Sequence, residues 1–152
     1  MTTIAWDGNM LAADRQVSFG ASRMGETDKV ARREDGALIG AAGSSAICQA
    51  LRQWFLAGEV GEMPKIEPDK ENAAAGFIIR PCGAIDDITS LGATRIVSNL
   101  YARGSGADYA LGAMSMGADA RRAVEVASMW DCSTGGGIDT LLLCVDAQES
   151  AT

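Results

Sequence analysis

The chain has 152 residues, 47% of them hydrophobic and 22% charged, which is typical of a globular protein large enough to bury a core. Its 20 acidic and 13 basic residues give a net charge of −7, which argues against a nucleic-acid partner because such binding relies on Lys and Arg. No apolar stretch approaches the roughly twenty residues of a membrane-spanning helix, so no membrane partner is expected.

The N-terminal third of the chain predicts a hairpin followed by a buried strand. Residues 2–6 and 10–13 are short apolar segments joined by Asp7-Gly8, a dipeptide typical of hairpin turns. The Gly and Ser residues within 17–25 favour a loop or an irregular strand. Small and aliphatic residues at 37–42 then predict a strand that is buried on both faces.

A helix and a long loop are predicted next. Apolar residues recur at helical spacing over about residues 45–57, and Ser44 or Ser45 suits the N-cap of this helix. Residues 58–73 contain Gly, Pro and several charges, a composition that predicts a loop.

The second half of the chain predicts more strands and two helices. Residues 77–80 and 84–88 form an expected hairpin, residues 95–102 a further strand and residues 141–145 a final buried strand. Two helices precede that final strand: Gly117 should stop the first and Asp119 should cap the second. The apolar face expected on the second helix consists of Ala123, Val126, Ala127 and Trp130.

The order of these elements predicts the fold class. Strands and helices occur in separate runs, which favours two sheets with helices outside them over a doubly wound parallel sheet. We therefore expect an α+β sandwich, formed by a single domain of residues 1–152 because no linker or repeat interrupts the chain.

Thr2 is the first candidate nucleophile. With no histidine in the chain, Ser-His and Cys-His mechanisms are excluded, and any nucleophile needs another base. Initiator Met is commonly removed before a small residue, and its removal would expose the α-amine of Thr2. An α-amine has a pKa of about 7.7–8.0, so it could act as the base for the Thr2 hydroxyl. Many proteins begin with Met-Thr, so Thr2 alone predicts little.

Asp14 and Lys29 give Thr2 a chemical context. Asp14 ends the strand that pairs with the Thr2 strand, and Lys29 lies one strand further on. A nearby Lys lowers the pKa of a hydroxyl and favours a neutral amine, while a carboxylate orients the Lys and keeps it charged. Taken singly, Asp14 is better explained as a turn carboxylate and Lys29 as a solvated charge. The combination is what predicts a site.

Short segments along nearly the whole chain carry a more specific signal. They are Thr2-Thr3-Ile4-Ala5, Leu11-Ala12-Ala13-Asp14, Asp28-Lys29-Val30-Ala31-Arg32-Arg33, Ile39-Gly40-Ala41-Ala42-Gly43-Ser44, Arg103-Gly104-Ser105-Gly106-Ala107-Asp108-Tyr109-Ala110 and Asp131-Cys132-Ser133-Thr134-Gly135-Gly136. In this order they resemble segments of proteasome β-subunits and of their simpler bacterial relative, HslV. In its short length and divergence the chain also resembles proteasome-like proteins encoded by bacteriophages and some bacteria.

The resemblance implies a four-layer αββα sandwich of two antiparallel sheets with flanking helices. One helical layer should be shortened, because the family has two long helices where this chain has one helix and the loop at 58–73. It also implies an N-terminal-nucleophile hydrolase, namely a threonine-type endopeptidase that works in a self-compartmentalising homo-oligomeric ring. Its substrate would be a peptide or an unfolded protein.

The resemblance also implies roles for individual residues. Thr2 would be the nucleophile and its freed amine the base, while Lys29 would tune the hydroxyl and Asp14 would hold Lys29. The backbone N–H of Gly43 would donate to the oxyanion of the tetrahedral intermediate. Three further residues would surround the amine through hydrogen bonds: Ser105, Asp131 and Thr134. For Gly43 and Ser105, simple helix entry is an equally good explanation.

Departures from the family pattern leave alternatives open. Arg15 adds bulk and charge near the expected cleft, where Ser18, Ser44 and Ser45 should also influence cleavage preference. The shortened helical layer puts ring contacts and an ATP-dependent unfoldase partner in doubt. If Met1 is retained, Thr2 has no free amine, and the chain would be a non-catalytic ring-forming assembly protein, for example of a phage virion. An amidase acting on small molecules is a third reading.

Metals, cofactors and location complete the expectations. Four Cys residues lie far apart and no His is present, so neither a metal nor a cofactor is expected, and the thiols should be reduced and mostly buried. The first residues carry no secretory signal, which favours the bacterial cytoplasm, with the virion as the alternative.

Overall fold

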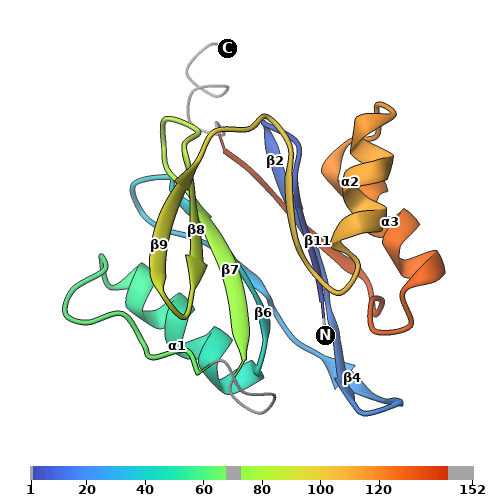
Figure 1. The fold of residues 1–152 in the computed structure, drawn as a ribbon, viewed down its shortest axis with the longest axis horizontal. Coiled ribbons are helices and arrows are strands. Elements are labelled where there is room, and N and C mark those ends of the chain that lie inside the picture. The colour runs from blue at the N-terminus through green and yellow to red at the C-terminus, as the bar shows by residue number, and fades with distance from the viewer. Residues whose placement is uncertain (1, 68–72, 144–152) are drawn as a thin grey trace.

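The computed structural model describes residues 2–67 and 73–143, and within them two antiparallel sheets face each other between outer helices (Figure 1). Helix α1 (Ser45–Leu56) covers the outer face of one sheet. Helices α2 (Ala107–Ser115) and α3 (Ala120–Trp130) cover the outer face of the other. The predicted α+β, four-layer αββα sandwich is therefore confirmed. No helix in the described ranges is long and apolar enough to cross a membrane.

The first sheet has the strand order β10-β1-β2-β11 and the second the order β5-β6-β7-β8-β9. The strands of the first sheet are β1 (Thr3–Trp6), β2 (Met10–Asp14), β10 (Tyr101–Gly104) and β11 (Ile138–Leu142). Those of the second are β5 (Val30–Arg32), β6 (Leu38–Gly43), β7 (Ala74–Ile79), β8 (Ile85–Thr89) and β9 (Gly92–Ile96).

The N-terminal hairpin forms as predicted, at the centre of the first sheet. The register pairs Ile4 with Ala13, which brings the end of β2 beside the start of β1. The turn is held by the Asp7 carboxylate, which accepts hydrogen bonds from the backbone N–H groups of Asn9 and Met10. Because Asp14 is the last residue of β2, this register places it next to the N-terminus of the chain.

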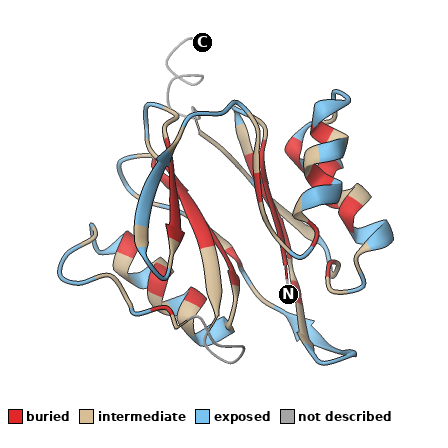
Figure 2. Cartoon of the chain, viewed as in Figure 1, coloured by how far each residue is buried: buried red, intermediate tan, exposed pale blue. Residues whose placement is uncertain are grey.

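Three hydrophobic clusters hold the layers together, and the buried residues gather on the facing strands and on the inner sides of the helices (Figure 2). The cluster between the sheets includes Trp6, Leu11 and Phe77. The cluster under α1 includes Leu51 and Phe55. The third cluster, under α2 and α3, consists mainly of Ala residues, which let the helices lie close to the sheet.

Residues 17–25 form a more regular structure than predicted. Strands β3 (Gln16–Phe19) and β4 (Ser22–Glu26) pair as a separate two-stranded sheet, with an irregular register between Val17 and Ser18. Gly20 adopts φ +57° in the turn, a conformation that Gly takes without strain. Gly20 therefore serves the hairpin turn, whereas Gly25 lies within β4 and pairs with Val17.

The strand predicted over 95–102 is wrong, because the chain leaves one sheet and enters the other within this segment. Strand β9 ends at Ile96 at the edge of the second sheet, and β10 begins at Tyr101 at the edge of the first. The connection is a bend in which the Ser98 hydroxyl donates to the carbonyl of Leu100 at 2.6 Å.

Other element boundaries also differ from the predictions. Ser44 occupies the N-cap position of α1, but its side chain makes no capping hydrogen bond. Strand β11 begins at Ile138 and is only partly buried, while residues 144 and 145 of the predicted last strand lie outside the described residues.

Helix α3 is capped by Asp119 as predicted, since the Asp119 carboxylate accepts from the backbone N–H of Arg122. The apolar face predicted for this helix is wrong in part, because the residues that α3 buries are Ala120, Ala123, Val124 and Ala127. Trp130 is 71% exposed. The buried face of α3 consists of small side chains because the helix packs closely against Ala residues of β1 and β2.

An ion-pair network anchors the loop after α1. The Glu59 carboxylate accepts from Arg33 at 2.7 Å and from Arg80 at 2.5 and 2.9 Å. The hydrogen bonds from Arg80 and then Arg33 outweigh burial and lower the pKa of Glu59. The pKa of Glu59 is therefore lower in the folded than in the unfolded chain, so this carboxylate stabilises the fold above its unfolded pKa of about 4.3.

We expect Glu59→Gln to reduce the free energy of unfolding at pH 7 by about 1–3 kcal/mol, the range for hydrogen bonds to charged groups. The difference from the unmodified chain should shrink as the pH falls through the folded pKa of Glu59, because both chains then carry a neutral group there. Urea titrations between pH 7 and pH 3 measure this. Glu62→Gln, which changes the charge equally at an exposed position, is the control. A pH-independent difference would contradict the explanation.

Candidate active site

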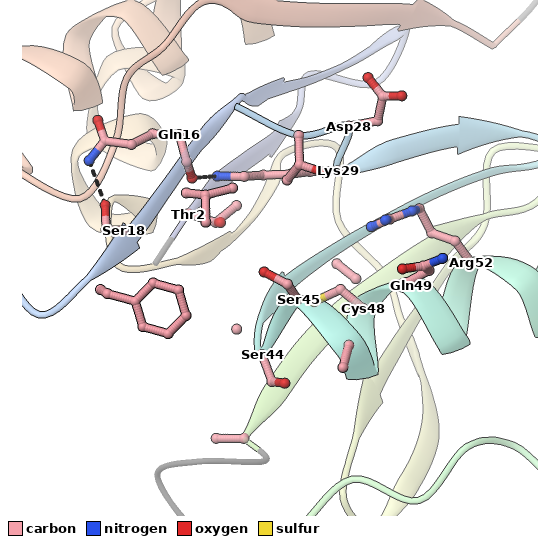
Figure 3. Close-up of a pocket in the computed structure, with 17 residues that line it drawn as sticks. Thr2, Gln16, Ser18, Asp28, Lys29, Ser44, Ser45, Cys48, Gln49 and Arg52 are labelled. Atoms are coloured by element: carbon pink, nitrogen blue, oxygen red, sulfur yellow. Dashed lines mark hydrogen bonds between the residues drawn. The ribbon is translucent and has the colours of Figure 1, made fainter. Parts of the chain in front are cut away.

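A cleft of about 740 Å³ opens between the start of α1 and the segment that follows β2 (Figure 3). Its lining comes from several elements that are distant in sequence. Thr2 and Lys29 contribute at its centre, Gln16 and Ser18 come from β3, and Gly43 ends β6. The first half of α1 adds a further wall.

Thr2 is almost fully buried, at 3% exposure, immediately before β1. Its carbonyl lies against Gly104 at the end of β10, and a Cβ at that position would be only 1.8 Å from the Thr2 carbonyl oxygen. Gly104 also has φ +103°. Only Gly tolerates both this close approach and this positive φ. Gly104 therefore allows β10 to pack closely against the N-terminal segment.

Asp14 and Lys29 form a buried ion pair beside Thr2. The Lys29 ammonium donates to Asp14 Oδ1 at 2.9 Å and to the carbonyl oxygen of Gln16 at 2.7 Å. Asp14 is fully buried and Lys29 is 5% exposed. Burial lowers the pKa of Lys29, and the negative charge of Asp14 opposes this shift. Lys29 therefore places a positive charge in the cleft, and the buried Asp14 carboxylate compensates that charge.

The Asp14 carboxylate is also fixed by backbone donors. Oδ1 accepts from the N–H of Thr3 at 3.0 Å, while Oδ2 accepts from Gln16 at 3.3 Å and Gly135 at 3.0 Å. Donors to a charged carboxylate stabilise its charged form. Asp14 thus ties together β1, β2, the Lys29 segment and the loop before β11.

Ser105, Asp131 and Thr134 form a second hydrogen-bonded group, which contacts Thr2 and Thr3. Asp131 Oδ2 accepts from the hydroxyls of Ser105 and Thr134, each at 2.6 Å. Burial raises the pKa of Asp131, but these two hydrogen bonds and a backbone N–H lower it more, so the net shift is downward. Ser105 Oγ lies 3.5 Å from the Thr2 carbonyl oxygen. The hydroxyls of Thr3 and Thr134 are 2.7 Å apart.

Gly43 lies where β6 ends and lines the same cleft as Thr2. It has φ +118°, and a Cβ there would be 2.4 Å from the carbonyl oxygen of Ala73. A side chain at this position would disrupt the pairing of β6 with β7. Gly is therefore required at the turn into α1, and it leaves the backbone there open to the cleft.

The structure thus brings the seven predicted residues into two adjoining groups. Thr2, Lys29 and Gly43 line the cleft, with Asp14 directly behind Lys29. Ser105, Asp131 and Thr134 meet Thr2 and Thr3 by hydrogen bonds but do not line the cleft. Their predicted placement around a free Thr2 amine stays a prediction.

Arg15 and the cysteines differ from expectation. Arg15 does not line the cleft, because its guanidinium pairs with Asp28 at 2.6 Å and with Asp139. Cys48 is buried, but Cys82 and Cys132 are exposed, and Cys144 lies outside the described residues. Within the described part of the chain, no three His, Cys, Asp or Glu side chains gather in a way that could hold a metal ion.

Sequence reasoning missed several residues of the site. Gln16 holds Lys29 through its carbonyl, and its side-chain amide donates to Ser18 Oγ at 2.7 Å and to the Cys132 carbonyl at 3.0 Å. Nothing in the sequence distinguishes Gln16 from a surface residue. Arg52 also lines the cleft, and its helical spacing from Cys48 could have indicated this.

Solved structures with the same fold include those of BPH and of HslV. BPH of Thiobacillus denitrificans in complex with epoxomicin has a TM-score of 0.68 and 20% identity, covering 93% of this chain and 96% of that one. A second BPH structure gives 0.63 at the same identity and coverage. Eukaryotic HslV from Trypanosoma brucei gives 0.67 at 22% identity, covering 93% and 97%. No protein-family model and no curated protein matches the sequence.

Proposed function

We propose that the chain is a threonine-type peptidase of the proteasome and HslV kind, with Thr2 as nucleophile after removal of Met1. One observation carries the proposal: Thr2 lies in a cleft beside the buried pair of Lys29 and Asp14, in a chain without histidine. The shared fold with BPH and HslV supports the same reading.

In the proposed reaction, the freed amine takes the proton of the Thr2 hydroxyl, and the oxygen attacks the carbonyl carbon of a peptide bond. The positive charge of Lys29 stabilises the developing alkoxide, and the backbone N–H of Gly43 donates to the oxyanion. The intermediate collapses when the C–N bond breaks and the leaving amine receives the proton. Water then attacks the ester on Thr2, which releases the acid and regenerates the hydroxyl.

We further propose that the active form is a homo-oligomeric ring that takes peptides or unfolded chains. This rests on the likeness to HslV and BPH. Only α1 covers the outer face of the second sheet in the described residues, so an unfoldase would have a smaller helical surface there than the family provides.

The state of the N-terminus tests the proposal. We expect the intact mass to lack one Met, and epoxomicin, which is bound in one BPH structure, to add once to the peptide that begins with Thr2. A variant with Ala inserted between Met1 and Thr2 is the control, because its free amine lies one residue away from the hydroxyl. It should neither react nor cleave peptides. A full-length mass without labelling or cleavage would contradict the proposal and support a ring-forming assembly protein.

A further inference from the structure

Arg52 places a guanidinium in the same cleft as Thr2. It lies on α1 one turn after Cys48, and both side chains line the cleft. In Figure 3, Arg52 and Gln49 point from α1 toward the space below Lys29. The charge of Arg52 reaches Cys48: burial raises the pKa of that thiol to about 11, and the Arg52 charge opposes this shift.

Arg52 has no hydrogen-bond or ion-pair partner among the described residues, and it is only partly exposed. Several other arginines of this chain are held by carboxylates. Arg33 pairs with Asp35 and Glu59, and Arg80 with Glu59 and Asp86. A partly buried guanidinium that lines a cleft and is not paired with a carboxylate offers its donors to whatever enters that cleft.

The other charges that line the cleft are already compensated. Lys29 is paired with Asp14 at 2.9 Å, and Asp28 with Arg15 at 2.6 Å. Arg52 is therefore the uncompensated charge of the described lining, and it is positive in a chain whose net charge is −7. The net negative charge of the protein disfavours an acidic peptide, so a local cation in the cleft has a large influence on whether such a peptide binds there.

We propose that Arg52 makes the cleft select peptides that carry an Asp or Glu side chain close to the cleaved bond. The guanidinium fits a carboxylate through two parallel hydrogen bonds, a geometry that an uncharged or basic side chain does not offer. This inference rests on the proposed peptidase function and names the substrate class of that same site.

Four fluorogenic peptides that differ only in Glu, Gln, Leu or Lys before the cleaved bond test the inference. We expect the unmodified protein to cleave the Glu peptide with about tenfold higher kcat/KM than the Gln peptide, the size expected of a hydrogen bond to a charged group. Arg52→Gln should bring this ratio to about one, and Arg52→Glu should favour the Lys peptide. Arg121→Gln removes the same charge from α3, on the opposite side of the molecule, and should keep the ratio.

A Glu-to-Gln ratio of one in the unmodified protein, or a ratio that Arg52→Gln leaves unchanged, would overturn the inference and leave the peptidase function standing. Peptide binding to a Thr2→Ala variant, followed by fluorescence polarisation, separates the two proposals because it needs no catalysis. If nothing is cleaved, tighter binding of the Glu peptide that is lost with Arg52→Gln supports the role of Arg52 alone. Equal binding of the Glu and Gln peptides refutes it.

Discussion

Thr2→Ala is expected to lower peptide cleavage by more than about a thousandfold while the chain remains folded. The substitution removes the hydroxyl that would form the acyl-enzyme. Steady-state cleavage of a fluorogenic peptide measures the loss. The thermal unfolding midpoint should move little, since the change removes a few atoms just before β1 and leaves the Asp14 and Lys29 pair intact.

Two companion variants make this result interpretable. Thr2→Ser keeps the hydroxyl and the α-amine and should retain cleavage. Thr27→Ala removes a different hydroxyl from the lining of the same cleft and should retain it too. Cleavage that persists in Thr2→Ala, or that is lost equally in Thr27→Ala, would show that Thr2 is not the nucleophile.

The part of the site that the sequence predicts is the part made by short-range pairing. Asp7-Gly8 fixes a tight hairpin, and the resulting register carries Asp14 next to the N-terminus. The prediction of Lys29 one strand further on is wrong in detail, because β3 and β4 intervene and Lys29 directly precedes β5 of the second sheet. The absence of histidine then restricts the chemistry of the nucleophile, so composition and local topology together lead to Thr2.

The rest of the site depends on contacts between segments far apart in the chain. Ser105, Asp131 and Thr134 reach Thr2 and Thr3 only because β10 pairs with β1 and the α2–α3 pair returns the chain to the same end. Their role could be suggested only by family resemblance. Gln16 could not be predicted from the sequence, because it contacts Lys29 through its backbone carbonyl. Every residue type has such a carbonyl.

The error at 95–102 has a related cause. The residues on both sides of the bend suit a strand, and propensity does not reveal which sheet a strand joins. The change of sheet is decided by the packing of Tyr101 edge-to-face on Phe77, with ring centroids 5.0 Å apart, and by the pairing of β10 with β1. These interactions form only when both sheets are in place.

Asp14→Asn is expected to reduce the free energy of unfolding by about 3–5 kcal/mol, the cost of removing one partner from a buried ion pair. The carboxylate is fully buried and receives Lys29 and the backbone N–H groups of Thr3, Gln16 and Gly135. An Asn amide would present its own N–H₂ to some of these donors and leave the Lys29 charge uncompensated. Since whole domains are stable by about 5–15 kcal/mol, much of the stability would be lost.

Lys29→Met should reduce stability less than Asp14→Asn, because the remaining carboxylate keeps its three backbone donors. Both variants should lose peptide cleavage, since Lys29→Met removes the positive charge beside Thr2 and Asp14→Asn removes the carboxylate that holds and compensates it. Urea unfolding at constant m-value measures the stabilities, and Asp28→Asn, at a side chain that is 76% exposed, should cost less than about 1 kcal/mol. A loss in Lys29→Met that equals or exceeds that in Asp14→Asn would mean that the backbone donors do not stabilise the carboxylate. Asp14 would then serve only to compensate Lys29.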